Sequence, residues 1–269
     1  LYGVAYRVKK TITIEDLVFR ANHIIKTQVQ IVEGQMTRNR IDLIYGTASF
    51  VDPHRLHIQQ ADGSVEHEAD FIVIAIGTEP ARPPDIPFDD DSIIDTDGLF
   101  ALKRIPSSIV IVGGGVIGTE YASILAMLDI PVTLIDKRPR LLEFVDTEIV
   151  EALQQHMRVT GITLYHNDEV LEIKKQPAGQ VRLRLKHAEP IEATIVMYAI
   201  GRVGTTSRLN LEAVGLKPDN RGRMTVNEHF QTTVPHIYAA GDVIGFPALA
   251  STSMQQGRHA SCHAFGHPD

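Results

Sequence analysis

The sequence is poor in cysteine, and this scarcity limits the chemistry that its 269 residues can support. The single cysteine, Cys262, excludes an internal disulfide, a cysteine-rich metal site and a redox-active cysteine pair within these residues. No apolar run approaches the length of a membrane-spanning helix, which is about 18 residues. The first residues also lack the basic segment followed by an apolar segment that is typical of a signal peptide. We therefore expect a cytoplasmic protein that does not enter a membrane.

The chain also lacks an excess of positive charge. Its 26 Lys and Arg residues stand against 33 Asp and Glu residues, which gives a formal net charge of −7. This balance excludes a global attraction to nucleic acid or to an anionic membrane surface. Three histidines, His259, His263 and His267, recur at a spacing of four, but Gly266 interrupts the helix that would align them. We predict no metal site.

The first hundred residues contain one helix and several short strands. Thr13 and Asp16 fit a capping box, and apolar residues recur at helical spacing, which predicts a helix over residues 11–33. The apolar run of residues 71–76 is typical of a strand buried on both faces. Short antiparallel strands are expected before this run, at residues 41–45, 57–59 and 65, and an extended connection after it, at residues 80–91.

From Ser108 onward, strands and helices alternate. Asp146 is placed to cap a helix that Gly161 ends. An order of strand, helix, strand, helix, meander and strand is typical of an α/β domain with a parallel sheet. The predicted strands occupy residues 109–112, 132–135, 181–186 and 195–200, and the first predicted helix occupies residues 116–128.

Two segments of the chain end in the same way. Ala75-Ile76-Gly77 and Ala199-Ile200-Gly201 each close an apolar strand that follows antiparallel strands. In the second case a glycine-rich fingerprint begins at Gly113, and the same distance counted back from Gly77 falls before Leu1. We therefore expect two duplicated units, of which the first lacks its opening strand and glycine loop, and a chain that is a fragment.

The glycine-rich fingerprint, Gly113 to Gly118, fits the pattern G-x-G-x-x-G between a predicted strand and a predicted helix, the context of a dinucleotide-binding turn. In such a turn Gly113 permits the tight bend, Gly115 lets a pyrophosphate approach the backbone, and Gly118 lets helix and strand pack closely. The helix N-terminus then faces the phosphates.

Residues at the end of the next predicted strand bear on the choice between NAD and NADP. Asp136 is placed to accept hydrogen bonds from the adenosine ribose, which favours NAD. Lys137, Arg138 and Arg140 follow it, and guanidinium groups there favour a ribose 2′-phosphate and therefore NADP. A site that accepts both nucleotides is the natural interpretation.

Two further acidic residues stand at the start of predicted elements. Glu120 lies in the first turn of the helix after the glycine loop, where it either favours the helix dipole or contacts the nicotinamide. Asp242 follows Gly241 at the end of a strand at residues 237–240, where it either binds a hydroxyl of a polyol ligand or caps the following helix.

These motifs together resemble a known family. Gly113–Gly118 with Glu120, Ala199–Arg202 and Tyr238–Val243 are similar to the two-dinucleotide flavoproteins of the dihydrolipoamide dehydrogenase and glutathione reductase family. Residues 75–80 resemble that family's glycine–threonine loop near the flavin. Within the family, residues 138–142, 198–205, 241–251 and 256–258 most resemble the soluble pyridine nucleotide transhydrogenases. Dihydrolipoamide dehydrogenases usually carry proline in place of Gly204, which weakens the resemblance to them.

The resemblance implies a flavoprotein oxidoreductase that transfers hydride between NADPH and NAD through FAD. It implies an α/β fold with two Rossmann-like three-layer dinucleotide-binding units, the FAD unit incomplete, and a homodimer or larger assembly of the full-length protein. FAD is implied at Gly77, Thr78, Gly241, Asp242, Leu249, Ala250 and Ser251. The nicotinamide dinucleotides NAD and NADP are implied at Gly113, Gly115, Val116, Ile117, Gly118, Glu120, Asp136, Lys137, Arg138, Arg140 and Gly201.

Two other functions stay open. A disulfide reductase of the dihydrolipoamide dehydrogenase type requires two cysteines, separated by four residues, in a segment before Leu1. A non-catalytic NAD-binding module or redox sensor requires neither flavin nor cysteine pair. The expected domains are a partial FAD-binding domain with its connection at residues 1–104, an NAD(P)-binding domain at residues 105–204, and a return segment of the FAD-binding domain at residues 205–269.

Overall fold

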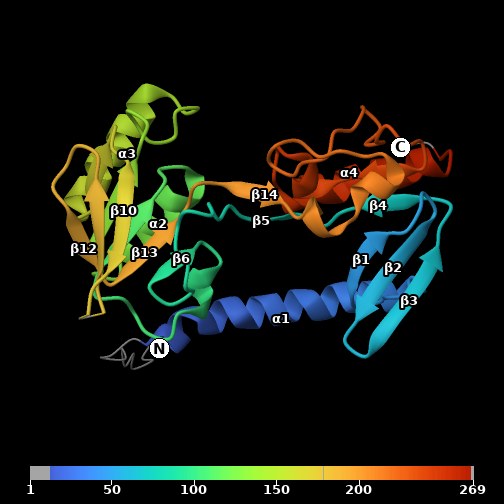
Figure 1. Cartoon of the computed structure of the whole chain (residues 1–269), viewed down its shortest axis with the longest axis horizontal. Helices are drawn as coiled ribbons and strands as arrows, with labels where there is room; N and C mark the ends of the chain where they lie inside the picture. Colours follow the sequence, from blue (N-terminus) through green and yellow to red (C-terminus); the bar gives the residue numbers. More distant parts are fainter. Residues whose placement is uncertain (1–12, 178, 268–269) are drawn as a thin grey trace, which may run out of the picture. The chain divides into compact units, whose positions relative to one another are not determined.

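The computed structural model describes residues 13–177 and 179–267, and these form two compact units (Figure 1). The first unit runs to Asp42 and continues over Pro80–Gly201, and the second comprises Leu43–Glu79 and Arg202 onward. Residues 11 and 12 of the predicted first helix and the last two residues of the predicted return segment lie outside the described residues. The three predicted domains stay a prediction. Within the described residues no helix is both long and apolar enough to cross a membrane.

The first unit is built on a five-stranded parallel sheet. Its strand order is β6 (Ile93–Asp95), β13 (Ile195–Tyr198), β7 (Ile109–Val112), β8 (Val132–Asp136) and β9 (Thr163–His166). The predicted α/β fold with a parallel sheet is therefore confirmed.

Two further layers cover this sheet (Figure 1). Ile109 and Ile111 pack on one face with helices α2 (Val116–Ala126) and α3 (Thr147–Val159), whereas Val110, between them, packs on the other face. Alternation along a strand sends successive side chains to opposite faces, so the apolar runs of the sequence serve both layers. The second covering layer is the antiparallel meander β10 (Val170–Lys175), β11 (Val181–Leu185) and β12 (Ile191–Ala193).

Helix caps define where the long helices of this unit begin. Helix α1 (Ile14–Arg38) starts at Thr13, and the predicted capping box with Asp16 is present. Asp146 accepts a hydrogen bond from the backbone of Glu148 and caps α3, and Gly161 follows the end of α3 with φ of 91°. The short 3-10 helix η1 (Gly98–Ala101) follows β6.

The second unit has a smaller parallel sheet, in which β4 (Ile72–Ile74) pairs with β15 (Ile237–Ala239). A meander of β1 (Thr47–Phe50), β2 (Arg55–Gln60) and β3 (Gly63–Glu68) precedes it, and β5 (Thr78–Pro80) pairs with β14 (Arg202–Gly204). The remaining elements are η2 (Thr206–Arg208), η3 (Leu211–Val214), η4 (Gly241–Ile244) and α4 (Ala250–Ala264).

Two predictions about strands are wrong. Residues 41–45 form no strand: β1 begins only at Thr47, and the side chains of Ile41, Leu43 and Tyr45 are exposed. The run of residues 71–76 yields a strand of only three residues that is buried on one face. Ile72 and Ile74 join the core of the second unit, but Val73 points to the opposite face and is 40% exposed within the described chain.

Candidate functional site

The glycine fingerprint forms a turn between β7 and α2, and the backbone shows what its glycines do. Gly113 has φ of 116°, and a Cβ there would lie 2.4 Å from the carbonyl oxygen of Ala199. A Cβ on Gly118 would lie 1.9 Å from the carbonyl oxygen of Gly113. These two glycines are therefore required for the turn itself.

Gly115 differs from its neighbours because nothing lies within 4 Å of a Cβ placed there. It is the N-cap residue of α2, and no side chain caps this helix. The first helical residues, Val116 and Ile117, thus follow an open backbone turn that suits an anion. That this turn binds a dinucleotide pyrophosphate stays a prediction at this point.

Asp136, the last residue of β8, carries a buried carboxylate beside the turn; its residue is 4% exposed. Its oxygens accept hydrogen bonds from the backbone N–H groups of Gly114 and Arg138 and from the guanidinium of Arg138. Burial alone would raise the pKa of Asp136, but the hydrogen bonds from Arg138 and Gly114 outweigh it and lower the pKa. The carboxylate is therefore ionised at neutral pH.

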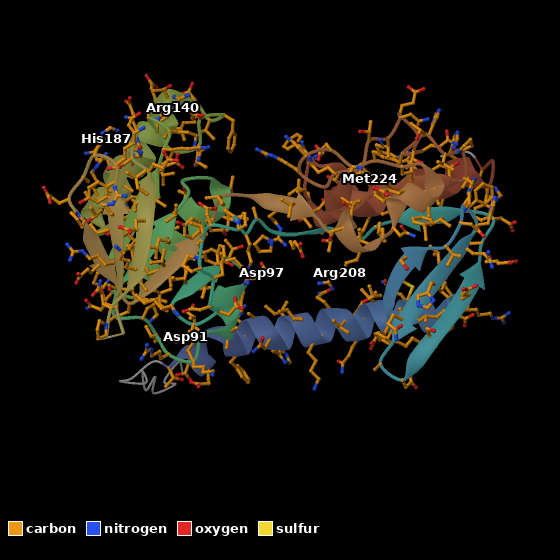
Figure 2. All side chains as sticks on the ribbon, viewed as in Figure 1. Asp91, Asp97, Arg140, His187, Arg208 and Met224 are labelled. Carbon is orange, nitrogen blue, oxygen red and sulfur yellow. The ribbon has the colours of Figure 1, made fainter. Side chains whose placement is uncertain are left out.

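The three basic residues after Asp136 have different positions. Arg138 forms the bidentate pair with Asp136, whereas Arg140 donates to the carbonyl oxygen of Glu143 at 2.9 Å and to the hydroxyl of Thr147. Arg140 therefore lies at the beginning of α3 (Figure 2), and Lys137 is exposed. The structure brings only one of the three basic side chains to the predicted ribose site.

Glu120 and Gly201 complete the predicted nicotinamide site. Glu120 is exposed in the first half of α2. Gly201 has φ of 112°, and its carbonyl oxygen accepts a hydrogen bond of 3.0 Å from the N–H of Ala81. Ala199, two residues earlier, carries the carbonyl group that lies close to Gly113. Glu120 and Gly201 thus belong to the same unit as the glycine turn.

The second unit brings two distant predicted residues together. Thr78 follows β4, Asp242 follows β15, and the hydroxyl of Thr78 donates to Asp242 Oδ2 at 3.5 Å. Both lie beyond the carboxyl ends of parallel strands, where open α/β sheets bind ligands. Gly77 and Gly241, the residues before them, have φ of 67° and 82°, which favours glycine at both positions.

Two residues support this cluster that the resemblance motifs contain but that are not among the predicted FAD residues. The guanidinium of Arg202 donates to the hydroxyl of Thr78 at 2.9 Å and to its carbonyl oxygen at 2.8 Å. Gln256 on α4 is buried and accepts a hydrogen bond of 2.7 Å from the N–H of Gly241. A polar residue on the buried face of a helix was the signal that could have identified Gln256. The remaining predicted FAD residues, Leu249, Ala250 and Ser251, are exposed at the start of α4.

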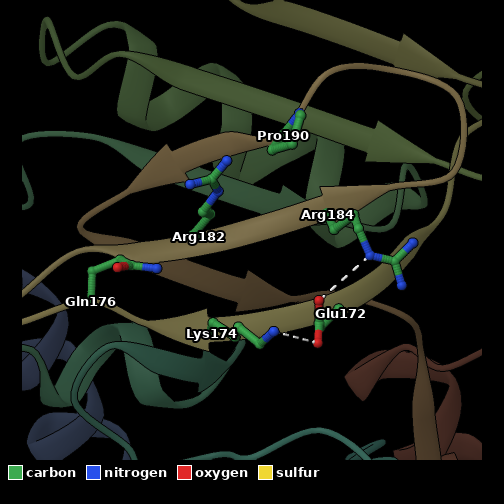
Figure 3. A pocket seen from close by; sticks show the side chains of 6 residues that line it. All are labelled: Glu172, Lys174, Gln176, Arg182, Arg184 and Pro190. Atoms are coloured by element: carbon green, nitrogen blue, oxygen red, sulfur yellow. Dashed lines mark hydrogen bonds and ion pairs between the residues drawn. The ribbon is translucent and has the colours of Figure 1, made fainter.

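A pocket lies elsewhere in the first unit, on the outer face of the β10–β12 meander (Figure 3). Three of its charged side chains are paired: Glu172 contacts Lys174 at 2.8 Å and Arg184 at 3.5 Å. None of the predicted site residues lines this pocket. Among the residues that the structure describes, no group of three or more His, Cys, Asp and Glu is arranged to hold a metal ion.

Comparison with known proteins gives three concordant results. Residues 4–257 match the family model described as pyridine nucleotide-disulphide oxidoreductase. Proteins named soluble pyridine nucleotide transhydrogenase are 48% identical over the whole chain in Mycobacterium tuberculosis, and 42% identical over 94% of it in Colwellia psychrerythraea. The chain spans only 58% and 54% of the lengths of these relatives.

Solved structures agree with the sequence relatives. The crystal structure of LpdA from Mycobacterium tuberculosis superposes with a TM-score of 0.89 at 29% identity, covering 96% of this chain and 57% of LpdA. A structure of RclA from Escherichia coli, titled a flavoprotein disulfide reductase, gives a TM-score of 0.78 at 27% identity, covering 95% of this chain and 61% of RclA. The resemblance indicated by the sequence motifs is confirmed: the chain belongs to the pyridine nucleotide-disulphide oxidoreductase family.

Proposed function

We propose that this chain is part of a flavoprotein that passes hydride between NADPH and NAD through FAD. The observation that carries the proposal is the pair of sites at the carboxyl ends of parallel strands, one in each unit. The first has the glycine turn and Asp136, and the second has Thr78 with Asp242. The 48% identical relatives named soluble pyridine nucleotide transhydrogenase support the same activity.

The residues of the first unit would bind a nicotinamide dinucleotide. Gly115 and the N-terminal amides of α2 would bind the pyrophosphate, because the backbone there is open and no side chain caps the helix. Asp136 and Arg138 would bind the adenosine ribose. Glu120 and Gly201 would contact the nicotinamide end, as the family resemblance implies.

The residues of the second unit fit FAD. Asp242 presents its carboxylate oxygens beyond a parallel strand, Thr78 donates to that carboxylate, and Gln256 accepts from the backbone N–H of Gly241. Asp242 would accept hydrogen bonds from ribitol or ribose hydroxyls. When bound, FAD would supply the hydride-accepting and hydride-donating chemistry, and the protein would position the nicotinamide against it. Gly77 and residues 249–251 would line this site.

We propose that both NAD and NADP are accepted. Asp136 favours an unmodified ribose and Arg138 favours a 2′-phosphate, and the two side chains occupy one place in the fold. The second nucleotide would then be reduced by the same flavin that the first one reduced. No catalytic acid, base or nucleophile from this chain is required for hydride transfer.

The test is transhydrogenation by the full-length protein. Flavin absorbance should be visible in the purified protein, NADPH should bleach it, and an oxidised NAD analogue should restore it. If the flavin is reduced only by a dihydrolipoamide-type dithiol and then reduces NAD, the protein is a disulfide reductase instead. Nucleotide binding without flavin absorbance and without hydride transfer would establish a non-catalytic module.

Assembly and location follow from the family resemblance and are also proposals. We propose a homodimer or larger assembly in the cytoplasm. Large apolar side chains that stay exposed on the second unit, such as Phe246, Met254 and Phe265, support burial by further protein. Sedimentation of the full-length protein tests this, and a monomer at micromolar concentration would contradict it.

A further inference from the structure

The Asp136–Arg138 pair occupies the proposed ribose site. Arg138 Nε lies 2.8 Å from Asp136 Oδ1, and Arg138 Nη2 lies 2.6 Å from Asp136 Oδ2. The backbone N–H groups of Arg138 and Gly114 donate to the same carboxylate. The Asp136 side chain is 3% exposed and that of Arg138 is 34% exposed. An incoming nucleotide therefore meets the arginine first.

A partly buried histidine of β9 lies beside this pair. His166 is the register partner of Asp136 in the parallel pairing of β8 with β9, so the two side chains lie on the same face of the sheet. Both ring nitrogens of His166 are buried, and neither has a hydrogen-bond partner among the described residues. Such orphaned nitrogens are uncommon in a native fold and indicate a function or a change of state.

The surroundings of His166 favour its neutral imidazole. Burial lowers the pKa of His166, and the positive charge of Arg158 on α3 lowers it further, while the negative charge of Asp136 acts in the opposite direction. Arg138 is paired with Asp136, and the opposite charges of the two side chains act in opposite directions on His166. The protonation state of His166 is therefore coupled to whether Arg138 stays on Asp136.

A 2′-phosphate competes directly for Arg138. Arginine binds phosphate in the same two-pronged manner in which it binds a carboxylate. If Arg138 turned to the phosphate, Asp136 would be a buried charge that had lost its cation, which is strongly unfavourable. A proton on the neighbouring imidazole would replace the missing positive charge.

We propose that the Arg138 guanidinium leaves Asp136 and binds the 2′-phosphate when a 2′-phosphorylated adenine nucleotide binds. We propose that His166 then takes up one proton from solvent. Arg138 is thereby a specificity-determining residue, and His166 is a positioning residue that acts through Asp136. An unphosphorylated ribose leaves Arg138 in place and takes up no proton. The inference rests on the proposed function only in so far as that function requires nucleotides to bind at the glycine turn.

Calorimetry of adenosine half-molecules tests the exchange without flavin chemistry. Adenosine 2′,5′-bisphosphate and 5′-AMP are titrated into the full-length protein at pH 7.5, in two buffers of different ionisation enthalpy. The second pKa of a 2′-phosphate is about 6, so the group is mostly dianionic at pH 7.5. The phosphate itself therefore exchanges few protons with the buffer when it binds. We expect uptake of about one proton with the bisphosphate and none with 5′-AMP.

Variants then assign the proton. In His166→Gln the uptake should vanish and the bisphosphate should bind about 3- to 10-fold more weakly, with 5′-AMP unaffected. His187→Gln removes an exposed histidine of the same unit (Figure 2) and should behave as wild type. Asp136→Asn should also abolish the uptake but should keep or tighten bisphosphate binding, because Arg138 is released. Arg138→Ala should weaken the bisphosphate about 10- to 100-fold.

Each outcome decides a stated point. Equal proton uptake with both nucleotides, or undiminished uptake in His166→Gln, contradicts the exchange alone and leaves the proposed function intact. Binding of neither nucleotide contradicts the exchange and the proposed function together. If His166→Gln fails to fold, the imidazole signals of the wild type, followed by nuclear magnetic resonance, replace it. One histidine should become protonated on bisphosphate binding and none on 5′-AMP binding. If no histidine becomes protonated with the bisphosphate, or if one does so with 5′-AMP, the inference is overturned.

Discussion

The hydroxyl of Thr78 donates to the carboxylate of Asp242 at 3.5 Å, although 164 residues separate them in the sequence. The parallel pairing of β4 with β15 creates this contact, because both residues follow the carboxyl ends of adjacent strands. Arg202 holds Thr78 from the other side through the threonine hydroxyl and carbonyl oxygens. A single hydroxyl thus connects a carboxylate with a guanidinium at the proposed flavin site.

Removal of the Asp242 carboxylate should reduce flavin binding. Asp242→Ala in the full-length protein is expected to weaken FAD binding about 10- to 100-fold, which is the effect of losing a hydrogen bond to a charged group. Flavin absorbance per mole of purified protein measures it. Asp62→Asn changes an exposed turn residue of the same unit and serves as the control. Full flavin content in Asp242→Ala would place FAD elsewhere.

The two glycines at the ends of the Gly115–Gly118 segment should respond differently to alanine. Gly118→Ala forces a Cβ against the backbone of Gly113 and should lower the free energy of unfolding by about 2 kcal/mol or more. Gly115→Ala has open space and an ordinary φ of −77°, so stability should not change. The methyl group of Gly115→Ala should nevertheless weaken NADH binding about 10-fold, since it lies where the pyrophosphate would approach the backbone.

Thermal unfolding and fluorescence titration with NADH separate these two effects. A loss of stability in Gly115→Ala, or tight NADH binding by it, would mean that the glycine turn has only a structural role.

The arginines after β8 should differ in their effect on nucleotide preference. Arg138→Ala is expected to lower kcat/KM for NADPH about 10- to 100-fold with little change for NADH, because a charge-assisted pair with phosphate is lost. Arg140→Ala should change both values less than about 3-fold, because its side chain already binds Glu143 and Thr147 at the start of α3. Unchanged NADPH preference in a variant that carries both Arg138→Ala and Arg140→Ala would remove the argument for dual nucleotide use.

Asp168 should make stability depend on pH. Its buried carboxylate accepts hydrogen bonds from the backbone N–H groups of Glu169, Lys186, His187 and Ala188, at 2.8 to 3.1 Å. Burial raises the pKa of Asp168, but these bonds outweigh it and lower the pKa below its ordinary value. The stabilisation is therefore complete above the unfolded pKa of about 3.9 and is lost as the pH falls through the lower folded value.

Urea unfolding of Asp168→Asn measures this contribution. The variant should lose about 2 kcal/mol of unfolding free energy at pH 7, and the difference from wild type should shrink below about pH 4. Asp91→Asn, at an exposed position of the same unit, is the matched control. A difference that is constant from pH 7 to pH 3 would show that the carboxylate charge contributes nothing.

Local sequence patterns predicted the first unit well and the second unit less well. Strand β7 and the capping residues Thr13 and Asp146 lie where the pattern indicates, because caps and buried runs depend on neighbours a few residues away. The alternating apolar residues 41–45 formed no strand, since alternation supplies no partner strand. Val73 in β4 is exposed for a similar reason: an apolar run does not show which of its faces will be covered.

The sequence by itself determined the glycine turn, the acidic residue that ends the next strand and the α/β order, because each depends on spacing within about 20 residues. Only the tertiary structure decided that Arg138, and not Arg140, binds Asp136, and that His166 lies beside them. It also decided that Thr78 meets Asp242. The positions of His166 and of Thr78 follow from strand register and strand order, which place residues side by side irrespective of their distance along the chain.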